Sequence, residues 1–124
     1  MMGGLPRLCK TVGLQRAMAI SLTGQEIKAE EAKKWGLVWK VVEGGREELL
    51  REAVEMGRSV ARGSPDSVVV SRADVRAAWG KGVKEATGEV LEEFGRRLME
   101  GSNVREGLRA FGERRAPRWV PSKL

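Results

Sequence analysis

The sequence predicts a mainly α-helical protein with one short β element. Apolar residues recur at three- and four-residue spacing through the second half of the chain, which is typical of helices with one buried face. Glycine and proline divide this half into separate helices. A single run rich in β-branched residues, at 37–42, indicates a strand. At 124 residues the chain is long enough to form one domain.

Residues 1–45 are expected to form three short helices followed by this strand. The apolar pattern over 5–22 is interrupted by Gly13, so we predict two helices hinged at that glycine. Residues 29–35 carry acids in the first turn and lysines in the last, the favourable order for the helix dipole. Gly36 ends this helix, and the strand that follows it should be buried.

Residues 46–115 are expected to be wholly helical. The first helix of this region has one apolar face and ends at Gly63. Ser64 then supplies an N-cap and Pro65 the first helical position of a second helix, which should run to about Trp79.

Two more helices and a tail complete the chain. The sequence GKG at 80–82 breaks the helical pattern; it lacks the preceding strand and the glycine spacing of a dinucleotide loop. Gly101 ends the next helix, and Ser102 or Asn103 caps the last one. The inner face of the last helix should consist of Val104, Leu108 and Phe111. Two prolines predict that residues 116–124 are extended.

The composition excludes several chemistries. The chain has no histidine, so Ser-His-Asp and Cys-His nucleophilic systems and histidine-bearing zinc sites are absent. Cys9 is the single cysteine; it permits no internal disulfide and is read as a small buried helix residue rather than a reactive thiol. Acid–base chemistry would have to come from carboxylates or lysines. The paired acids of the helices alternate with basic residues and read as solvated surface, so no catalytic dyad and no metal site is predicted.

The net charge of +6 raises the question of an anionic partner. Basic residues alternate with acids along the helices, and the aromatic residues are sparse and not interleaved with a basic run. This pattern argues against nucleic-acid binding, and a small polyanionic ligand fits the charge at least as well. No apolar run approaches membrane-spanning length and the first residues form no secretory leader, so no membrane association is expected.

Three motifs in order resemble one known superfamily. Residues 3–13 (GGLPRLCKTVG) look like G-G-T-Q-R-L-x-R-x-V-G, and residues 22–42 match L-T-G-x-x-I-S-A-E-E-A-x-x-x-G-L-V-N-x-V-V. Residues 103–117 resemble E-G-x-x-A-F-x-E-K-R-x-P. These are patterns of the crotonases, the enoyl-CoA hydratase/isomerase superfamily. The resemblance implies the C-terminal part of the crotonase α/β spiral fold together with its helical trimerisation region.

The sequence departs from the family pattern at a few positions. Lys28 stands where the family usually has the serine that caps the short helix, which should weaken that N-terminus. Trp39 replaces a common asparagine, and Leu5 and Pro6 replace threonine and glutamine. These changes affect local packing and leave the resemblance intact.

The chemistry implied by the resemblance lies upstream of the matched motifs. Crotonases hold a thioester oxygen with two backbone N–H groups as it gains enolate character, and hydratases add two glutamates beside a water. In the family pattern these elements precede the segment that matches residues 3–13, and only Met1 and Met2 precede it here. No catalytic residue is therefore assigned. The implied substrate is an acyl-CoA, with no separate cofactor, and the implied assembly is a trimer or hexamer.

Peripheral roles are what the resemblance can assign. Phe111, Arg114 and Arg115 lie on the motif that helps close the acyl-CoA site in the family, which predicts contact with CoA and its phosphates. The structural alternative is that Phe111 anchors the core of the last helix and both arginines are solvated. Residues Gly3, Gly4, Arg7 and Leu8 match a segment near subunit contacts.

The final residues Ser122, Lys123 and Leu124 form the peroxisomal import tripeptide, which a receptor reads together with the terminal carboxylate. Prolines 117 and 121 keep this tail free of helix, as receptor binding requires. Peroxisomes host β-oxidation, where enoyl-CoA hydration and isomerisation occur. The tripeptide and the family resemblance therefore agree on a peroxisomal location and an import receptor as partner.

Together these observations predict the C-terminal portion of a peroxisomal enoyl-CoA hydratase/isomerase family protein, with residues 1–45 ending the spiral core, 46–115 helical and 116–124 the targeting tail. On its own the chain should be catalytically inert. The alternative from another class is a non-catalytic module that associates with full-length crotonase subunits through the trimer surface.

Overall fold

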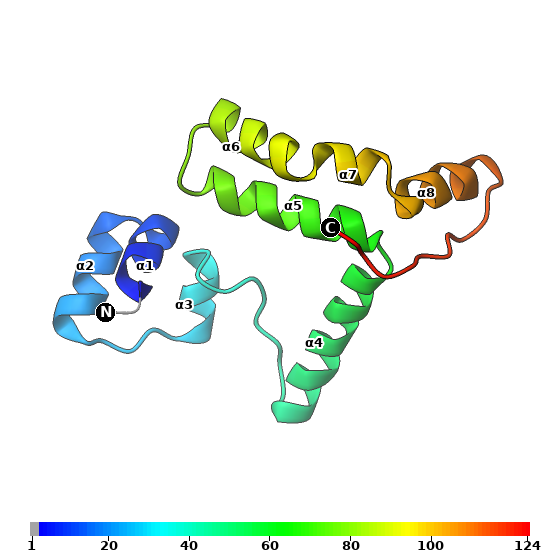
Figure 1. Ribbon diagram of the computed structural model, residues 1–124. Helices are drawn as coiled ribbons and strands as arrows, with labels where there is room; N and C mark the ends of the chain where they lie inside the picture. The colour runs from blue at the N-terminus through cyan, green and yellow to red at the C-terminus, as the bar shows by residue number, and fades with distance from the viewer. Residues whose placement is uncertain (1–2) are drawn as a thin grey trace. The chain divides into compact units, whose positions relative to one another are not determined.

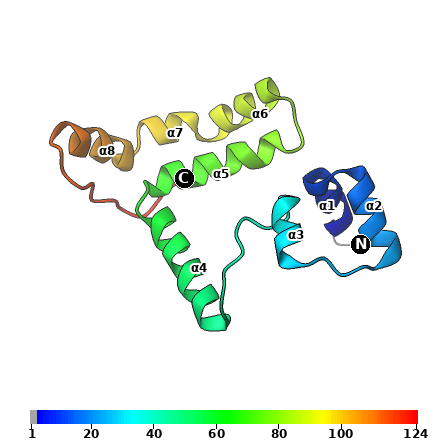
Figure 2. The same cartoon turned by 180° about the vertical axis from the view of Figure 1, so that it is seen from behind.

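The structure is a computed structural model that describes residues 3–124. The chain divides between Glu52 and Ala53 into two compact units, which are described separately. Figures 1 and 2 show a helical molecule, and residues 3–124 contain no β-strand. The mainly helical prediction is thus confirmed.

The first unit is built on α1 (Gly4–Val12), α2 (Leu14–Thr23) and α3 (Ala29–Lys34). Gly13 separates α1 from α2 with φ of 86°, a left-handed backbone value that favours glycine, and the predicted hinge is confirmed. Small side chains fill the interior of this unit: Val12, Ala17 and Ala32 are its buried apolar residues.

Helix α3 bears out two expectations. It carries Glu30 and Glu31 in its first turn and two lysines in its last. Lys28 occupies the N-cap position and its side chain makes no capping hydrogen bond, as its replacement of a serine predicts. The guanidinium of Arg16 lies over the Trp35 ring, 5.1 Å from its centroid, and joins the end of α3 to α2.

The predicted buried strand at 37–42 does not form. The segment consists of turns and extended backbone, and Trp39 is 85% exposed. A strand needs a partner to satisfy its N–H and C=O groups, and the described part of the chain offers this segment none. The expectation of a buried β element is wrong for this chain, and the reason is a missing neighbour rather than an unsuitable sequence.

Helix α4 (Arg46–Ala61) has the predicted amphipathic pattern but no buried residue. Four of its apolar residues are each at least half exposed: Leu49, Leu50, Val54 and Val60. An apolar helix face of this kind is normally covered by another element.

The second unit is a helical layer with a returning tail. Helix α5 (Pro65–Ala78) packs against α6 (Val83–Val90), which continues through a π-helical turn, η1 (Leu91–Gly95), into α7 (Arg96–Met99). Figures 1 and 2 show this long helical segment running back alongside α5. Helix α8 (Ser102–Gly112) follows, and the buried apolar side chains of the unit are Ala86, Val90 and Ala110.

Local signals at the helix ends are confirmed in this unit. The Ser64 hydroxyl accepts a hydrogen bond from the Ser67 N–H at 3.5 Å, and Pro65 is the first residue of α5. Residues 80–82 separate α5 from α6. The N-cap of α8 is Gly101, however, so neither Ser102 nor Asn103 caps that helix; Asn103 has another use.

Candidate functional site: helix α8 and the C-terminal tail

The tail is extended, as predicted, and it is docked on the helices of the second unit. The Asn103 amide holds it: the Val120 N–H donates to Asn103 Oδ1, and Asn103 Nδ2 donates to the Val120 carbonyl, both at 3.0 Å. Asn103 is only 2% exposed. A side-chain amide thus pairs with backbone in the way that a neighbouring strand would.

Asp66 positions that amide. Asn103 Nδ2 also donates to Asp66 Oδ2 at 3.0 Å, so both amide hydrogens are used. Asp66 lies in the first turn of α5 and is 4% exposed. Its other oxygen, Oδ1, has no hydrogen-bond partner among the described residues. The amide oxygen can point only toward the tail, because the carboxylate accepts from the nitrogen.

Trp119 provides a second attachment of the tail. Its indole N–H donates to the Arg62 carbonyl at 2.9 Å, across 57 residues of sequence. The ring lies against Gly107 of α8, where an added Cβ would come within 3.3 Å of the ring edge. Glycine at this position leaves room for the indole.

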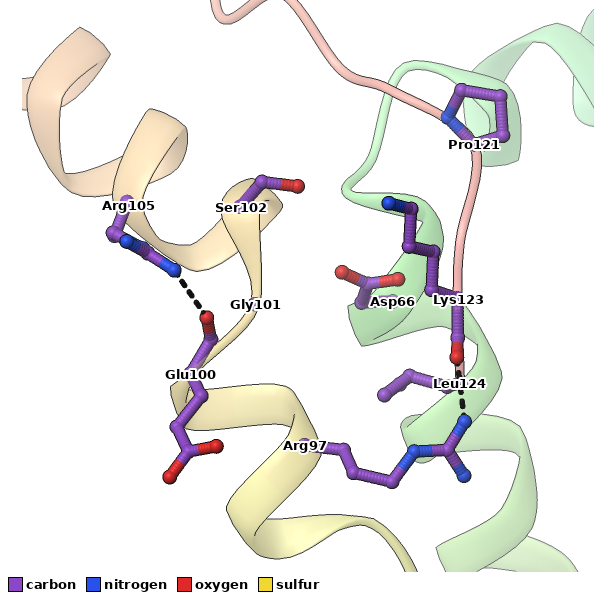
Figure 3. A pocket seen from close by; sticks show the side chains of 9 residues that line it. All are labelled: Asp66, Arg97, Glu100, Gly101, Ser102, Arg105, Pro121, Lys123 and Leu124. Atoms are coloured by element: carbon purple, nitrogen blue, oxygen red, sulfur yellow. Dashed lines mark hydrogen bonds between the residues drawn. The ribbon is translucent and has the colours of Figure 1, made fainter.

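The predicted import tripeptide lies beside a pocket of about 350 Å³ between α5, α7, α8 and the tail (Figure 3). Arg97 Nη2 donates to the Lys123 carbonyl at 2.5 Å, and the Leu124 N–H donates to Ser122 Oγ at 3.2 Å. Residues that line the pocket include Asp66, Arg97, Ser102, Arg105, Lys123 and Leu124. The tripeptide is therefore held against the folded chain rather than projecting from it.

Phe111 does not form the inner face of α8. It is 86% exposed, and Leu108 on the preceding turn is also largely exposed, so the interpretation of Phe111 as a core anchor is wrong in this chain. Ala110 and Asn103 are the buried residues of α8 instead. The exposed ring is free of packing within the chain and available to a ligand or another surface.

The two predicted phosphate-binding arginines differ in their surroundings. Arg115 donates to Glu106 through both terminal nitrogens, at 2.6 and 3.0 Å, and through Nε to Glu113 at 2.6 Å. Arg114 is exposed and has a positive φ of 53°. The backbone N–H of Arg115 bonds back to the Ala110 carbonyl at 3.0 Å, which closes the end of α8.

Glu106 is the electrostatic centre of this end. The Arg115 guanidinium, together with the Arg118 N–H that donates to Oε1 at 2.6 Å, lowers the pKa of Glu106 to about 2. The same pairing raises the pKa of Arg115, with Glu106 as the larger cause and Glu113 as the smaller. Glu106 thus fixes both the end of α8 and the start of the tail.

The predicted subunit-contact residues lie on the first turns of α1. Gly3 is the N-cap of α1 with φ of 73°, and Gly4 is its first residue. Gly3, Gly4 and Arg7 are exposed, and Leu8 is half-buried. Their position leaves them available for contacts, and their assignment stays a prediction.

Two kinds of feature, a cluster of metal-binding side chains and a membrane-spanning helix, are absent from the described residues. Residues 3–124 hold no group of three or more Cys, Asp or Glu side chains placed to bind a metal ion. No helix in that range has the length and apolar character to cross a bilayer.

The residues that hold the tail were not predicted from the sequence. Asp66 reads as an ordinary first-turn acid, Asn103 as a cap, and Arg97 as one of many surface arginines. One signal was present: a tryptophan between prolines in an extended tail needs a surface to cover it.

The helices and these motifs match the C-terminal helical part of the crotonase fold, and comparison with known proteins gives the family. The model of the enoyl-CoA hydratase/isomerase family matches residues 1–122. The chain belongs to this family, so the crotonase resemblance is confirmed.

Similar proteins agree with this assignment. The chain is 43% identical over 98% of its length to the mevalonyl-coenzyme A hydratase sidH of Aspergillus fumigatus, and 40% identical over 98% to SIDH of Beauveria bassiana. It spans 45% and 44% of those two proteins. Among solved structures, enoyl-CoA hydratase EchA1 of Mycobacterium marinum matches 97% of this chain and 46% of its own with a TM-score of 0.86 at 26% identity. The chain therefore spans less than half the length of these relatives.

Proposed function

We propose that the chain is the C-terminal part of a hydratase that acts on acyl-CoA thioesters and interconverts mevalonyl-CoA, or a related branched thioester, with its dehydrated form. The observation that carries the proposal is the 43% identity to a mevalonyl-CoA hydratase along 98% of this chain. The net charge of +6 favours a ligand with several phosphates. Fatty-acid enoyl-CoA thioesters are the alternative substrates within the same chemistry.

The part played by these residues is to support and close the site rather than to carry out the reaction. No residue matches the oxyanion donors or catalytic glutamates that the family pattern places upstream. Phe111 and Arg114 are exposed at the end of α8, where contact with a CoA moiety needs no rearrangement of the chain. Arg115 stabilises the conformation of that end through ion pairs with Glu106 and Glu113.

A direct assay tests this proposal. The 124-residue chain and a form extended upstream by the family's spiral region are compared for hydration of enoyl-CoA thioesters, including the dehydrated form of mevalonyl-CoA. The extended form should turn over the branched thioester, and the chain alone should be inactive. Activity of the chain alone would contradict the inert role, and an extended form that rejects the branched thioester would contradict the substrate.

Peroxisomal location forms a second part of the proposal. It is supported by the terminal tripeptide Ser122-Lys123-Leu124. A fluorescent protein fused upstream of residue 1 should colocalise with peroxisomes, and deletion of Leu124 should leave it diffuse. Deletion has no effect if another signal directs the protein, and that result would remove the tripeptide from the proposal.

The exposed apolar faces favour one further candidate, an interaction module that joins full-length family subunits. Val75, Leu91 and Leu108 are each more than 60% exposed, and α4 has no buried residue. Co-purification of the tagged chain with an intact hydratase subunit would support this role. A chain that aggregates alone and recovers no subunit would count against it.

A further inference from the structure

We propose that the docked tail withholds the import tripeptide, so that docking on the helices and binding to the import receptor exclude each other. This inference rests on the proposed peroxisomal targeting. Its structural basis is the set of contacts that hold residues 119–124 to α5, α7 and α8.

The first step is that the tail is held at three points along its length. The Trp119 indole N–H donates to the Arg62 carbonyl. The Val120 backbone is bound by both ends of the Asn103 amide. The Lys123 carbonyl accepts from Arg97. Two of these three attachments are made to backbone atoms of the tail. The docking therefore does not depend on the side chains of the tripeptide.

The second step is that the tripeptide itself is engaged. The Lys123 carbonyl accepts from Arg97, and the Leu124 N–H is turned back onto the Ser122 hydroxyl. Ser122 and Leu124 are half-buried, and Leu124 and Lys123 line the pocket beside Arg97 (Figure 3). A receptor that reads an extended tripeptide and its terminal carboxylate would need the same backbone and side-chain groups.

The third step concerns reach. With Val120 fixed, only four residues follow it, and a fully extended chain of four residues spans at most about 14 Å. A receptor site that encloses the tripeptide would meet α5 and α7 before the peptide could enter. The tail must leave Arg97 first, and further release from Asn103 would follow.

Release of the tail should begin at its hydrogen bond to Arg97. Arg97 lies on the exposed side of α7, whereas Asn103 is buried and fixed by Asp66. The apparent dissociation constant for a receptor that binds only the released tail equals the intrinsic value divided by the released fraction. Because this hydrogen bond is solvent-exposed, its loss should raise that fraction by the amount typical of one ordinary hydrogen bond, about fivefold.

The test measures binding of the full 124-residue chain to the peptide-binding domain of a peroxisomal import receptor, with a synthetic peptide of residues 117–124 as the reference. The variant is Arg97→Ala, and the matched control is Arg96→Ala. Arg96 is its neighbour on α7, carries the same charge and pairs with Glu100 instead of the tail. Deletion of Leu124 serves as the blank.

The proposal expects the free peptide to bind most tightly, the wild-type chain at least fivefold more weakly, and Arg97→Ala to recover about fivefold while Arg96→Ala does not. If the peptide binds and the wild-type, Arg97→Ala and Arg96→Ala chains all match it, the inference is wrong and the targeting proposal stands. If the peptide itself fails to bind, both the targeting proposal and the inference are overturned. Hydrogen exchange at the Val120 amide reports docking independently, and rapid exchange there in the wild-type chain would also overturn the inference.

Discussion

Asn103 and Val120 are joined by two hydrogen bonds of 3.0 Å that use opposite ends of one side-chain amide. This buried pair attaches the tail to α8 without any strand pairing. Because Asp66 takes the remaining amide hydrogen at 3.0 Å, the orientation of the amide is determined by a carboxylate on α5. Three segments far apart in sequence meet at a single side chain.

Removal of this side chain should release the tail. Asn103→Ala leaves the Val120 N–H and C=O without their partner and should lower the free energy of unfolding by about 1–3 kcal/mol. The Val120 amide should also exchange faster with solvent. Chemical denaturation and hydrogen exchange measure the two effects. Ser71→Ala, at an exposed polar site on α5, is the control, and equal protection of Val120 in both variants would contradict this role.

A charge at the same position gives a separate prediction. Asn103→Asp keeps the shape but replaces the donating nitrogen by an oxygen 3.0 Å from Asp66 Oδ2. Two carboxylates in a buried site repel, so this variant should be the less stable of the two at neutral pH and should recover as acid protonates one of them. Unfolding midpoints of Asn103→Ala and Asn103→Asp, measured from pH 7 down to about pH 4, test both the ranking at neutral pH and the recovery in acid. A midpoint that falls steadily with acid for Asn103→Asp would contradict the recovery.

The helix boundaries could be predicted because they depend on local chemistry. Gly13 and Ser64-Pro65 specify a hinge and a helix start through residues within a few positions of them. The strand at 37–42 could not be judged locally, since its stability depends on a neighbour that the described chain does not supply.

The tail contacts illustrate the same limit. The separation between Trp119 and its Arg62 partner is 57 residues, and that between Asn103 and Asp66 is 37. No periodicity or spacing encodes such pairs. The two interpretations of Phe111, contact with CoA and core anchor, stayed open for a related reason: the apolar pattern of α8 marks a face to be covered, but not which molecule covers it.

Acid should weaken the end of α8 through Glu106. Its pKa in the folded chain is about 2, below its ordinary value of 4.5, because Arg115 and the Arg118 N–H stabilise the charged form. The unfolded chain therefore binds the proton first as pH falls. The stabilisation is fully present above about pH 4.5 and is lost as the pH falls through about 2.

Glu106→Gln should reduce the loss of stability that accompanies a fall in pH from about 4.5 to about 2. Glu48 and Glu113 also have lowered pKa values, from backbone hydrogen bonds and from Arg109 respectively, so some acid sensitivity should remain. The measurement is the denaturation midpoint between pH 2 and 6 for the wild type, Glu106→Gln and an exposed control, Glu92→Gln. If the midpoint changes with pH in the same way in all three proteins, the Glu106–Arg115 pair is excluded as a source of the acid sensitivity.

Arg114 combines a strained backbone with a proposed binding role. At φ of 53° a residue with a side chain is disfavoured by roughly 1 kcal/mol relative to glycine, partly offset by the greater freedom of glycine when unfolded. Arg114→Gly should therefore raise the free energy of unfolding by up to about 1 kcal/mol. The control Arg76→Gly, in the regular helix α5, should lower it by about 1 kcal/mol. Destabilisation by both substitutions would contradict the strain argument.

Phe111 separates a role in folding from a role in substrate contact. Because the ring is 86% exposed, Phe111→Ala should change the free energy of unfolding of the chain by less than about 0.5 kcal/mol. If the ring covers part of the CoA moiety in the protein that includes the upstream spiral, loss of that contact should raise KM about tenfold with little change in kcat. Met99→Ala, on α7 and 69% exposed, removes a comparable apolar group away from the motif and should leave KM unchanged. An unchanged KM in Phe111→Ala, with a shift in subunit assembly instead, would place the ring at a subunit interface and remove it from the substrate site.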